Sequence, residues 1–140
     1  MKIYDGKGMV LGRLATLVAK DALLGEEVKV VNCEHVVISG KKTETVAHEK
    51  QKRDRKGYPT KSAKFSRLPD RVVRRTIRGM LPWKLTRGKE AFKLIMCYIG
   101  VPEVLASEKM IHVEKLSVKK FPTLKYMTVG EVCKGLGGKL

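Results

Sequence analysis

The chain has 140 residues, 43% of them hydrophobic and 31% charged, which is enough for one folded core and too few for two. Its 30 Lys and Arg against 14 Asp and Glu give a net charge of +16, so nucleic acid is the expected partner, ahead of an anionic membrane surface. No apolar run could span a bilayer and no signal-peptide pattern occurs, so we predict a cytosolic protein without membrane contact.

The first forty residues predict a β-α-β unit. Residues 2–5 have extended character, and residues 11–24 predict a largely buried helix that stops at Gly25. Residues 27–33 and 36–39 are β-branched and apolar, which favours strands buried on both faces of a parallel sheet. The expected fold class is therefore α/β, with a right-handed crossover.

Positive charge is concentrated in residues 41–89, which carry a net charge of +13 against +3 for the rest of the chain. We expect a single domain, residues 1–140, in which this basic segment is inserted into an α/β scaffold. The segment opens with a polar, helix-tolerant stretch, residues 43–54. Residues 55–67 follow as a basic loop, expected to be disordered in the free protein and to become ordered against a polyanion.

A second helix is predicted where four arginines recur at i, i+3, i+4 and i+7 and so share one face: Arg71, Arg74, Arg75 and Arg78. Val73, Ile77 and Met80 fall on another face and can pack against a core. Gly79, by adopting a left-handed conformation, and Pro82, by lacking an N–H, are expected to end this helix.

The remaining residues predict short elements. Residues 89–96 favour an amphipathic helix with Thr86 as a possible cap, and residues 97–99 favour a fourth strand. Residues 110–113 have extended character. A capping box opens a last helix over residues 128–136, after which several glycines are expected to release the tail.

Motifs for catalysis or metal binding are weak. The pattern Gly6-x-Gly8-x-x-x-Gly12 differs by one residue from the dinucleotide-binding spacing. The three histidines are scattered, and the three cysteines lack C-x-x-C spacing and are expected to be reduced thiols. We therefore expect no enzyme activity, no catalytic residue, no cofactor, no metal and no small-molecule substrate.

The basic segment with interleaved aromatic side chains predicts RNA binding. Lys and Arg bind phosphates, and aromatic rings stack on unpaired bases, which RNA exposes more often than duplex DNA does. Gly79 and Gly88 are expected to let RNA approach the backbone, and Trp83 is equally compatible with core packing. The candidate RNA-binding residues are Lys50, Lys52, Arg53, Arg55, Lys56, Tyr58, Lys61, Lys64, Arg67, Arg71, Arg74, Arg75, Arg78, Gly79, Trp83, Lys84, Arg87 and Lys89.

Two other classes of function stay open from the residues alone. A DNA- or chromatin-binding module would prefer duplex DNA and would not need aromatic residues in the loop. A doubly wound nucleotide-binding enzyme would bind a mononucleotide or dinucleotide at the Gly6–Gly12 turn.

Five motifs follow one another over residues 2–102: Asp5 with Leu11-Gly12-Arg13-Leu14-Ala15-Thr16 and Ala19, Val30-Val31-Asn32 with Ile38-Ser39-Gly40, Arg78-Gly79-Met80-Leu81-Pro82, Gly88 with Ala91, and Tyr98-x-Gly100-x-Pro102. With these motifs in this order, the chain resembles the large-subunit ribosomal protein thirteen family in its compact archaeal form. Gly6, where Ala is common, and Cys97, where an aliphatic residue is common, depart from the pattern.

The resemblance implies a three-layer α/β/α fold on a four-stranded, mainly parallel sheet, to which the basic loop and helix are an extension. It also implies a structural, non-enzymatic component of the large ribosomal subunit that binds large-subunit rRNA directly and early in assembly, beside neighbouring ribosomal proteins.

Overall fold

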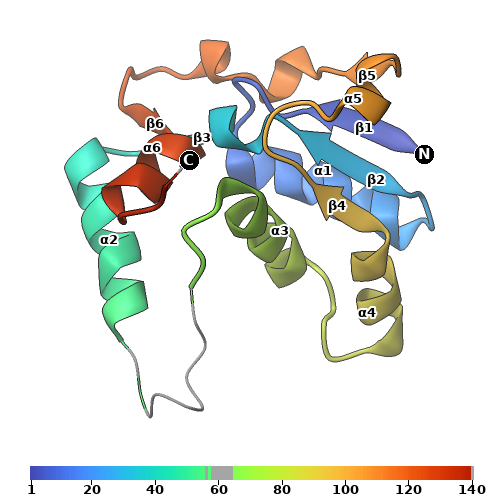
Figure 1. Ribbon diagram of the computed structural model, residues 1–140, viewed down its shortest axis with the longest axis horizontal. Coiled ribbons are helices and arrows are strands. Elements are labelled where there is room, and N and C mark those ends of the chain that lie inside the picture. The colour runs from blue at the N-terminus through green and yellow to red at the C-terminus, as the bar shows by residue number, and fades with distance from the viewer. Residues whose placement is uncertain (56, 58–64, 140) are drawn as a thin grey trace.

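The computed structural model describes residues 1–55, 57 and 65–139 (Figure 1). Its central sheet has the order β4-β2-β1-β5, and each neighbouring pair of strands is parallel. The strands are β1 (Lys2–Asp5), β2 (Val28–Val31), β4 (Ile95–Cys97) and β5 (Met110–Ile111). The predicted four-stranded parallel sheet and its β-α-β unit are thus confirmed, although β4 begins two residues earlier than expected.

Helices cover one face of this sheet. α1 (Leu11–Leu23), α3 (Pro69–Met80) and α4 (Thr86–Lys93) pack together below it in Figure 1. Leu14 and Val18 from α1 meet Val73 and Ile77 from α3 in one core, and all four side chains are fully buried. Because α3 brings its apolar face to this core, its opposite face is left for other contacts.

The other face of the sheet is covered by thinner structure. Ile3 and Val31 pack there against Leu105 from α5 (Glu103–Ala106). Two 3-10 turns, Glu114–Leu116 and Val118–Lys120, continue this layer along the top of Figure 1. The three-layer arrangement is therefore confirmed, with a full helical layer on only one side.

The predicted third strand forms but joins a different sheet. β3 (Val37–Ser39) pairs antiparallel with β6 (Tyr126–Thr128), and β5 takes the edge position beside β1. The chain changes direction just after β2, where Asn32 has φ +56° and a 3-10 turn, Cys33–His35, follows. This local reversal moves β3 out of the plane of the main sheet.

All three cysteines are buried free thiols, as expected. Burial, assisted by Asp70, raises the pKa of Cys133 to about 11. A hydrogen bond with Cys97 and burial raise the pKa of Cys33 well above its usual range. Because the thiolate is the reactive form of a cysteine, the raised pKa values of Cys33 and Cys133 identify these two as packing residues rather than nucleophiles.

Two helices flank the end of the chain. α2 (Lys42–Asp54) is polar and has no buried residue, and it lies beside α6 (Val129–Gly135) at the left of Figure 1. The predicted capping box of α6 is confirmed: Glu131 N–H donates to Thr128 Oγ1 (3.1 Å), and Thr128 N–H donates to the Glu131 carboxylate (2.9 Å).

Removing the capping hydroxyl by Thr128→Ala is expected to destabilise the protein by about 1 kcal/mol, because the backbone N–H of Glu131 loses its acceptor. Urea unfolding followed by circular dichroism measures the loss. Thr123→Ala, at an exposed position outside the helices, is the matched control and should change stability by less than about 0.5 kcal/mol. Equal stability of the two variants would contradict the role of the cap.

The capping carboxylate also makes stability depend on pH. The Thr128 N–H, followed by Lys42, lowers the pKa of Glu131 below its ordinary value of 4.5. A depressed folded-state pKa contributes stability above pH 4.5 that is lost as the pH falls through the folded value. Glu131→Gln should therefore flatten the acid side of the stability profile and leave its neutral-to-basic shape unchanged.

Candidate nucleic-acid interface

The position of the arginine helix follows from its sequence. Pro69 occupies the first turn of α3, where its missing N–H costs little. The helix ends at Met80, because Leu81 precedes Pro82 and is extended (ψ 150°). The prediction that a left-handed Gly79 ends the helix was wrong, since Gly79 is an ordinary helical residue. Met80 was also misassigned, because it is 41% exposed rather than in the core.

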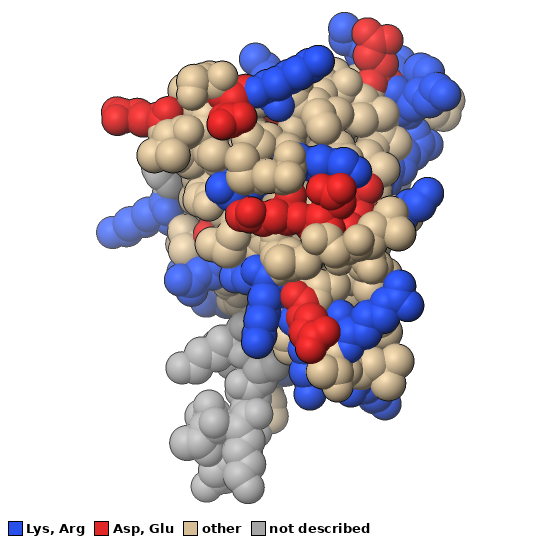
Figure 2. All heavy atoms as spheres, turned by 90° about the vertical axis from the view of Figure 1, so that its right-hand side faces the viewer, with Lys and Arg blue, Asp and Glu red and all other residues tan. Residues whose placement is uncertain are grey.

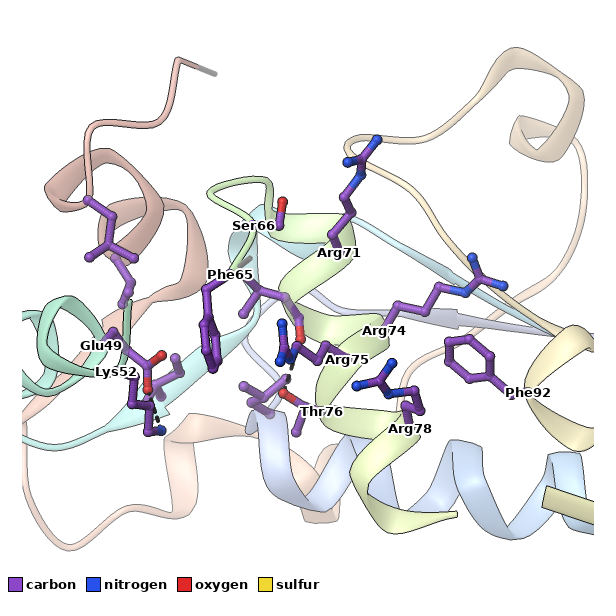
Figure 3. A pocket seen from close by; sticks show the side chains of 15 residues that line it. Glu49, Lys52, Phe65, Ser66, Arg71, Arg74, Arg75, Thr76, Arg78 and Phe92 are labelled. Carbon is purple, nitrogen blue, oxygen red and sulfur yellow. Dashed lines mark hydrogen bonds and ion pairs between the residues drawn. The ribbon is translucent and has the colours of Figure 1, made fainter. Parts of the chain in front are cut away.

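Three of the four arginines on α3 lie against aromatic rings. The Arg75 guanidinium carbon lies 3.9 Å from the Phe65 ring centroid, and that of Arg74 lies 4.5 Å from the Phe92 centroid. Arg78 lies 5.1 Å from the centroid of Trp83. Figure 3 shows Arg74 reaching toward Phe92, and Arg75 toward Phe65 on the opposite side of the helix.

Stacking holds each guanidinium by its flat face and leaves its N–H edge available. The N–H donors of a stacked guanidinium lie in the plane of the guanidinium group itself. They keep the fork geometry that suits phosphate or carboxylate oxygens. Within the described part of the chain, neither Arg71, Arg74 nor Arg78 forms an ion pair with an acidic residue. At Arg71, Arg74 and Arg78 the helix therefore presents positive charge that no described acidic residue neutralises.

One donor in this cluster is buried and unsatisfied. Arg74 Nε has almost no solvent exposure and no hydrogen-bond partner among the described residues. A buried donor without an acceptor carries a free-energy penalty of about 1–3 kcal/mol, and native proteins rarely keep one without a reason. A ligand can reach this shielded atom only if the Arg74 side chain turns outward.

These side chains line a groove of about 470 Å³. α3 contributes one wall, Phe92 from α4 stands at one end, and Glu49 and Lys52 from α2 stand across from α3 (Figure 3). Glu49 is paired with Lys52 at 2.8 Å, so the single acidic residue of the lining is offset by its neighbour. The groove is thus basic along its length and apolar at its floor.

The candidates on and after α2 divide into two groups. Lys50, Lys52 and Arg55 are exposed; Lys52 lines the groove, whereas Lys50 borders a separate hollow beside Arg53 and Arg67. Arg53 and Arg67 instead donate to backbone carbonyls, to Leu136 O and Gly137 O, each at 3.0 Å. Four further candidates, Lys56, Tyr58, Lys61 and Lys64, and most of the predicted basic loop, lie outside the described residues.

The turn after α3 holds the remaining candidates. Trp83 is 40% exposed and meets Phe92 edge-on, with centroids 5.1 Å apart, so it lies outside the core, next to a residue that lines the groove. Lys84 and Lys89 are exposed. Arg87 borders a separate hollow beside Thr16 and Lys20 of α1, so it is not brought to the groove.

Two sequence assignments in this turn need correction. Gly88 is buried, and a Cβ there would lie 2.2 Å from Pro82 O, so this glycine serves internal packing rather than RNA approach. Thr86 is the first residue of α4 rather than its cap, and Leu85 at the cap position makes no side-chain bond. Phe92 was not among the predicted site residues, because its contact with Arg74 depends on how α3 and α4 meet.

Gly79 stays a candidate for close backbone approach. It is exposed in the last turn of α3, and a Cβ would meet no atom within 4 Å. Gly79→Ala should therefore stabilise the free protein by about 0.5–1 kcal/mol, because Gly is entropically costly inside a helix. Urea unfolding measures this, and a destabilised variant would contradict the helical assignment.

The groove differs in charge from the end of the sheet at which the central strands β1 and β2 begin. Figure 2 shows that side of the molecule, where acidic side chains lie among the basic ones. Basic groups are paired here: Lys2 with Asp21 (3.1 Å), Lys29 with Glu27 (3.8 Å) and the N-terminal amine with Glu26 (3.7 Å). This face has the charge pattern of an ordinary solvated surface.

The turn proposed for nucleotide binding is used internally. The N–H groups of Gly6, Gly8, Met9 and Val10 donate to backbone carbonyls, and that of Lys7 donates to Asp5 Oδ1. These donors are not directed at a phosphate, which disfavours the nucleotide-binding alternative. Among the described residues there is also no acidic, His or Cys cluster suited to a metal ion, and no helix long and apolar enough to cross a bilayer.

Comparison with known proteins gives the family. Residues 1–104 match the family described as Ribosomal protein L13, and this match includes β1 to β4 and the whole described groove wall on α3. The chain belongs to the ribosomal protein L13 family.

Close archaeal relatives extend the match to the full length. A protein of Methanocaldococcus jannaschii is 43% identical and one of Methanococcoides burtonii 40% identical, each covering 99% of both chains. One of Archaeoglobus fulgidus is 41% identical over 96% of this chain and 86% of its own. All three are named large ribosomal subunit protein uL13, so the resemblance to the L13 family in its archaeal form is confirmed.

Proposed function

We propose that this chain is a structural, non-enzymatic component of the large ribosomal subunit. In this role it binds large-subunit rRNA directly, supports early assembly of the subunit, and resides in the cytoplasm as part of the ribosome. Membership of the L13 family and the names of its relatives support the ribosomal assignment. Its partners are rRNA and neighbouring large-subunit proteins, without membrane or small-molecule substrate.

The observation that carries direct RNA binding is the row of ring-stacked arginines along the groove. Arg74 and Arg78 lie on rings and lack acidic partners among the described residues, and the Nε of Arg74 has no acceptor there. A phosphate oxygen is the acceptor that the fork geometry fits best. Half-exposed Trp83 adds a face for an unpaired base.

The charge distribution also favours a polyanion. Residues 41–89 hold most of the excess positive charge, and α2 and α3 from this segment form opposite walls of the groove. On this proposal residues 1–140 act as a single domain, whose scaffold holds the basic segment against RNA. The predicted RNA-binding residues outside the groove, such as Lys84, Arg87 and Lys89, add peripheral phosphate contacts.

A binding titration against large-subunit rRNA tests the proposal, with small-subunit rRNA and duplex DNA as competitors at several salt concentrations. We expect tight binding that survives both competitors and falls steeply with salt, because many phosphate contacts release counterions. Equal binding to all three polyanions would contradict specific rRNA recognition, and preference for duplex DNA would favour a DNA-binding module instead.

A further inference from the structure

Two arginines from opposite ends of the basic loop meet at one place. Arg53, near the end of α2, donates to Leu136 O, and Arg67, just before α3, donates to Gly137 O, both at 3.0 Å. These acceptors are adjacent carbonyls directly after α6. The two residues are 14 positions apart in sequence, and both are held by consecutive carbonyls of the tail.

The tail at this point has a defined structure rather than the released end that its glycines suggested. Gly138 N–H donates to Cys133 O (2.8 Å), Gly137 N–H donates to Lys134 O (2.9 Å), and Gly137 has φ +79°. This is a Schellman motif, which closes a helix through a left-handed residue. The carbonyls of Leu136 and Gly137, the two residues that follow α6, accept from Arg53 and Arg67.

The acceptors are electrostatically suited to guanidinium groups. Carbonyls at the C-terminal end of a helix have no intrahelical donor and carry the negative end of the helix dipole. A charged donor makes a stronger hydrogen bond to them than a neutral donor does. Arg53 is half-buried at this contact, so its bond is partly shielded from water.

The tail also packs tightly against both flanks of the loop. A Cβ on Gly138 would lie 2.7 Å from Arg67 O and 2.8 Å from Cys133 O, both backbone atoms. Gly135 faces Val46 of α2, where a Cβ would lie 3.2 Å from a Val46 methyl. Lys42 of α2 pairs with Glu131 of α6 at 3.2 Å. Since α2 has no buried residue, these contacts are what positions it.

α6 is moreover the floor between the two walls of the groove. Val132 and Leu136 line it together with residues of α2 and α3. The separation of the basic residues on α2 from the arginines of α3 therefore depends on how each helix docks on α6.

We propose that the glycine-rich cap of α6, residues 135–138, is the anchor that positions the RNA-binding surface. Resting on the proposed function, this inference makes Arg53 and Arg67 positioning residues, which hold the flanks of the basic loop, rather than phosphate ligands. The role of the chain beyond the family match, residues 105–140, then includes pre-organising the surface that the basic segment presents.

Gly138→Ala tests the anchor without changing charge. Its Cβ cannot fit against two backbone oxygens, so the cap must shift. We expect affinity for large-subunit rRNA to fall about tenfold or more, with the slope of log K against log salt unchanged. Gly12→Ala, which adds a Cβ with no atom within 4 Å, is the matched control and should leave affinity unchanged.

Arg53→Gln separates positioning from direct phosphate contact. If Arg53 is a positioning residue, Arg53→Gln should weaken binding to large-subunit rRNA and leave the slope of log K against log salt unchanged. The loss of affinity should not add to that of Gly138→Ala, because both variants act through one contact. A direct phosphate ligand would instead lower the slope by about 0.7–0.9 and combine additively with the glycine variant. That result, or wild-type affinity of Gly138→Ala, would overturn the inference.

Amide hydrogen exchange of the free protein keeps the two proposals distinguishable. If the cap is the anchor, exchange at residues 50–54 and 67–70 becomes faster in Gly138→Ala, while the amides of α1 keep their protection. Unchanged exchange would refute the anchor even if rRNA binding is real. Faster exchange in a protein that shows no preference for large-subunit rRNA would uphold the anchor and refute the proposed function.

Discussion

Replacing Arg74 and Arg78 together with Glu should lower affinity for large-subunit rRNA by about a hundredfold or more. Each charge-assisted hydrogen bond is worth roughly 1.5–3 kcal/mol, and the new carboxylates repel phosphate. The slope of log K against log salt should fall by roughly 1.4–1.8, the contribution of two phosphates. A filter-binding or fluorescence titration measures both quantities.

Lys109→Glu with Lys115→Glu is the matched control for this charge reversal. Both lysines are exposed and lie around β5 and the 3-10 turn beyond it, on the sheet face opposite α3. The control changes net charge equally, so it should lower affinity only by the general loss of field. Arg74→Gln with Arg78→Gln guards against misfolding of the Glu variant. Equal effects of the groove and control pairs would refute the assignment of the groove.

Ile77→Ala should produce the largest loss of stability, about 2–5 kcal/mol. The side chain is fully buried between α3 and α1, so its removal loses transfer free energy and leaves a cavity. A loss of this size is a large part of the stability of an ordinary domain. Urea unfolding measures it, and because α3 carries the arginines, rRNA affinity should weaken as well.

An exposed apolar side chain provides the comparison for Ile77. Val104 of α5 is 84% exposed, and Val104→Ala should change stability by less than about 0.5 kcal/mol. A similar small change at Ile77 would mean that α3 is not held by its apolar face, and the geometry of the groove would lose its basis.

Features that depend on patterns among residues close together in the sequence could be predicted. The arginines of α3 repeat with helical period, and Val73 and Ile77 on the other face do pack in the core. The capping box at Thr128 is a local motif, and it forms as predicted. The α/β fold followed from an apolar strand, helix and strand in close succession.

Features that depend on distant contacts could not be predicted. Pairing of β3 with β6 joins residues about ninety positions apart, and nothing in either strand specifies that partner. Glycines after α6 were expected to release the tail, because a Schellman cap and a flexible end have the same composition. Phe92 was not predicted as a site residue, since its stacking on Arg74 depends on how α3 and α4 meet.

The most direct test is an electron cryo-microscopy map of the large ribosomal subunit that contains this chain. Our account predicts rRNA along the groove between α2 and α3, with phosphate oxygens within hydrogen-bond distance of the guanidinium groups of Arg74 and Arg78. A groove that faces solvent, or one filled by a segment of another protein, would contradict it.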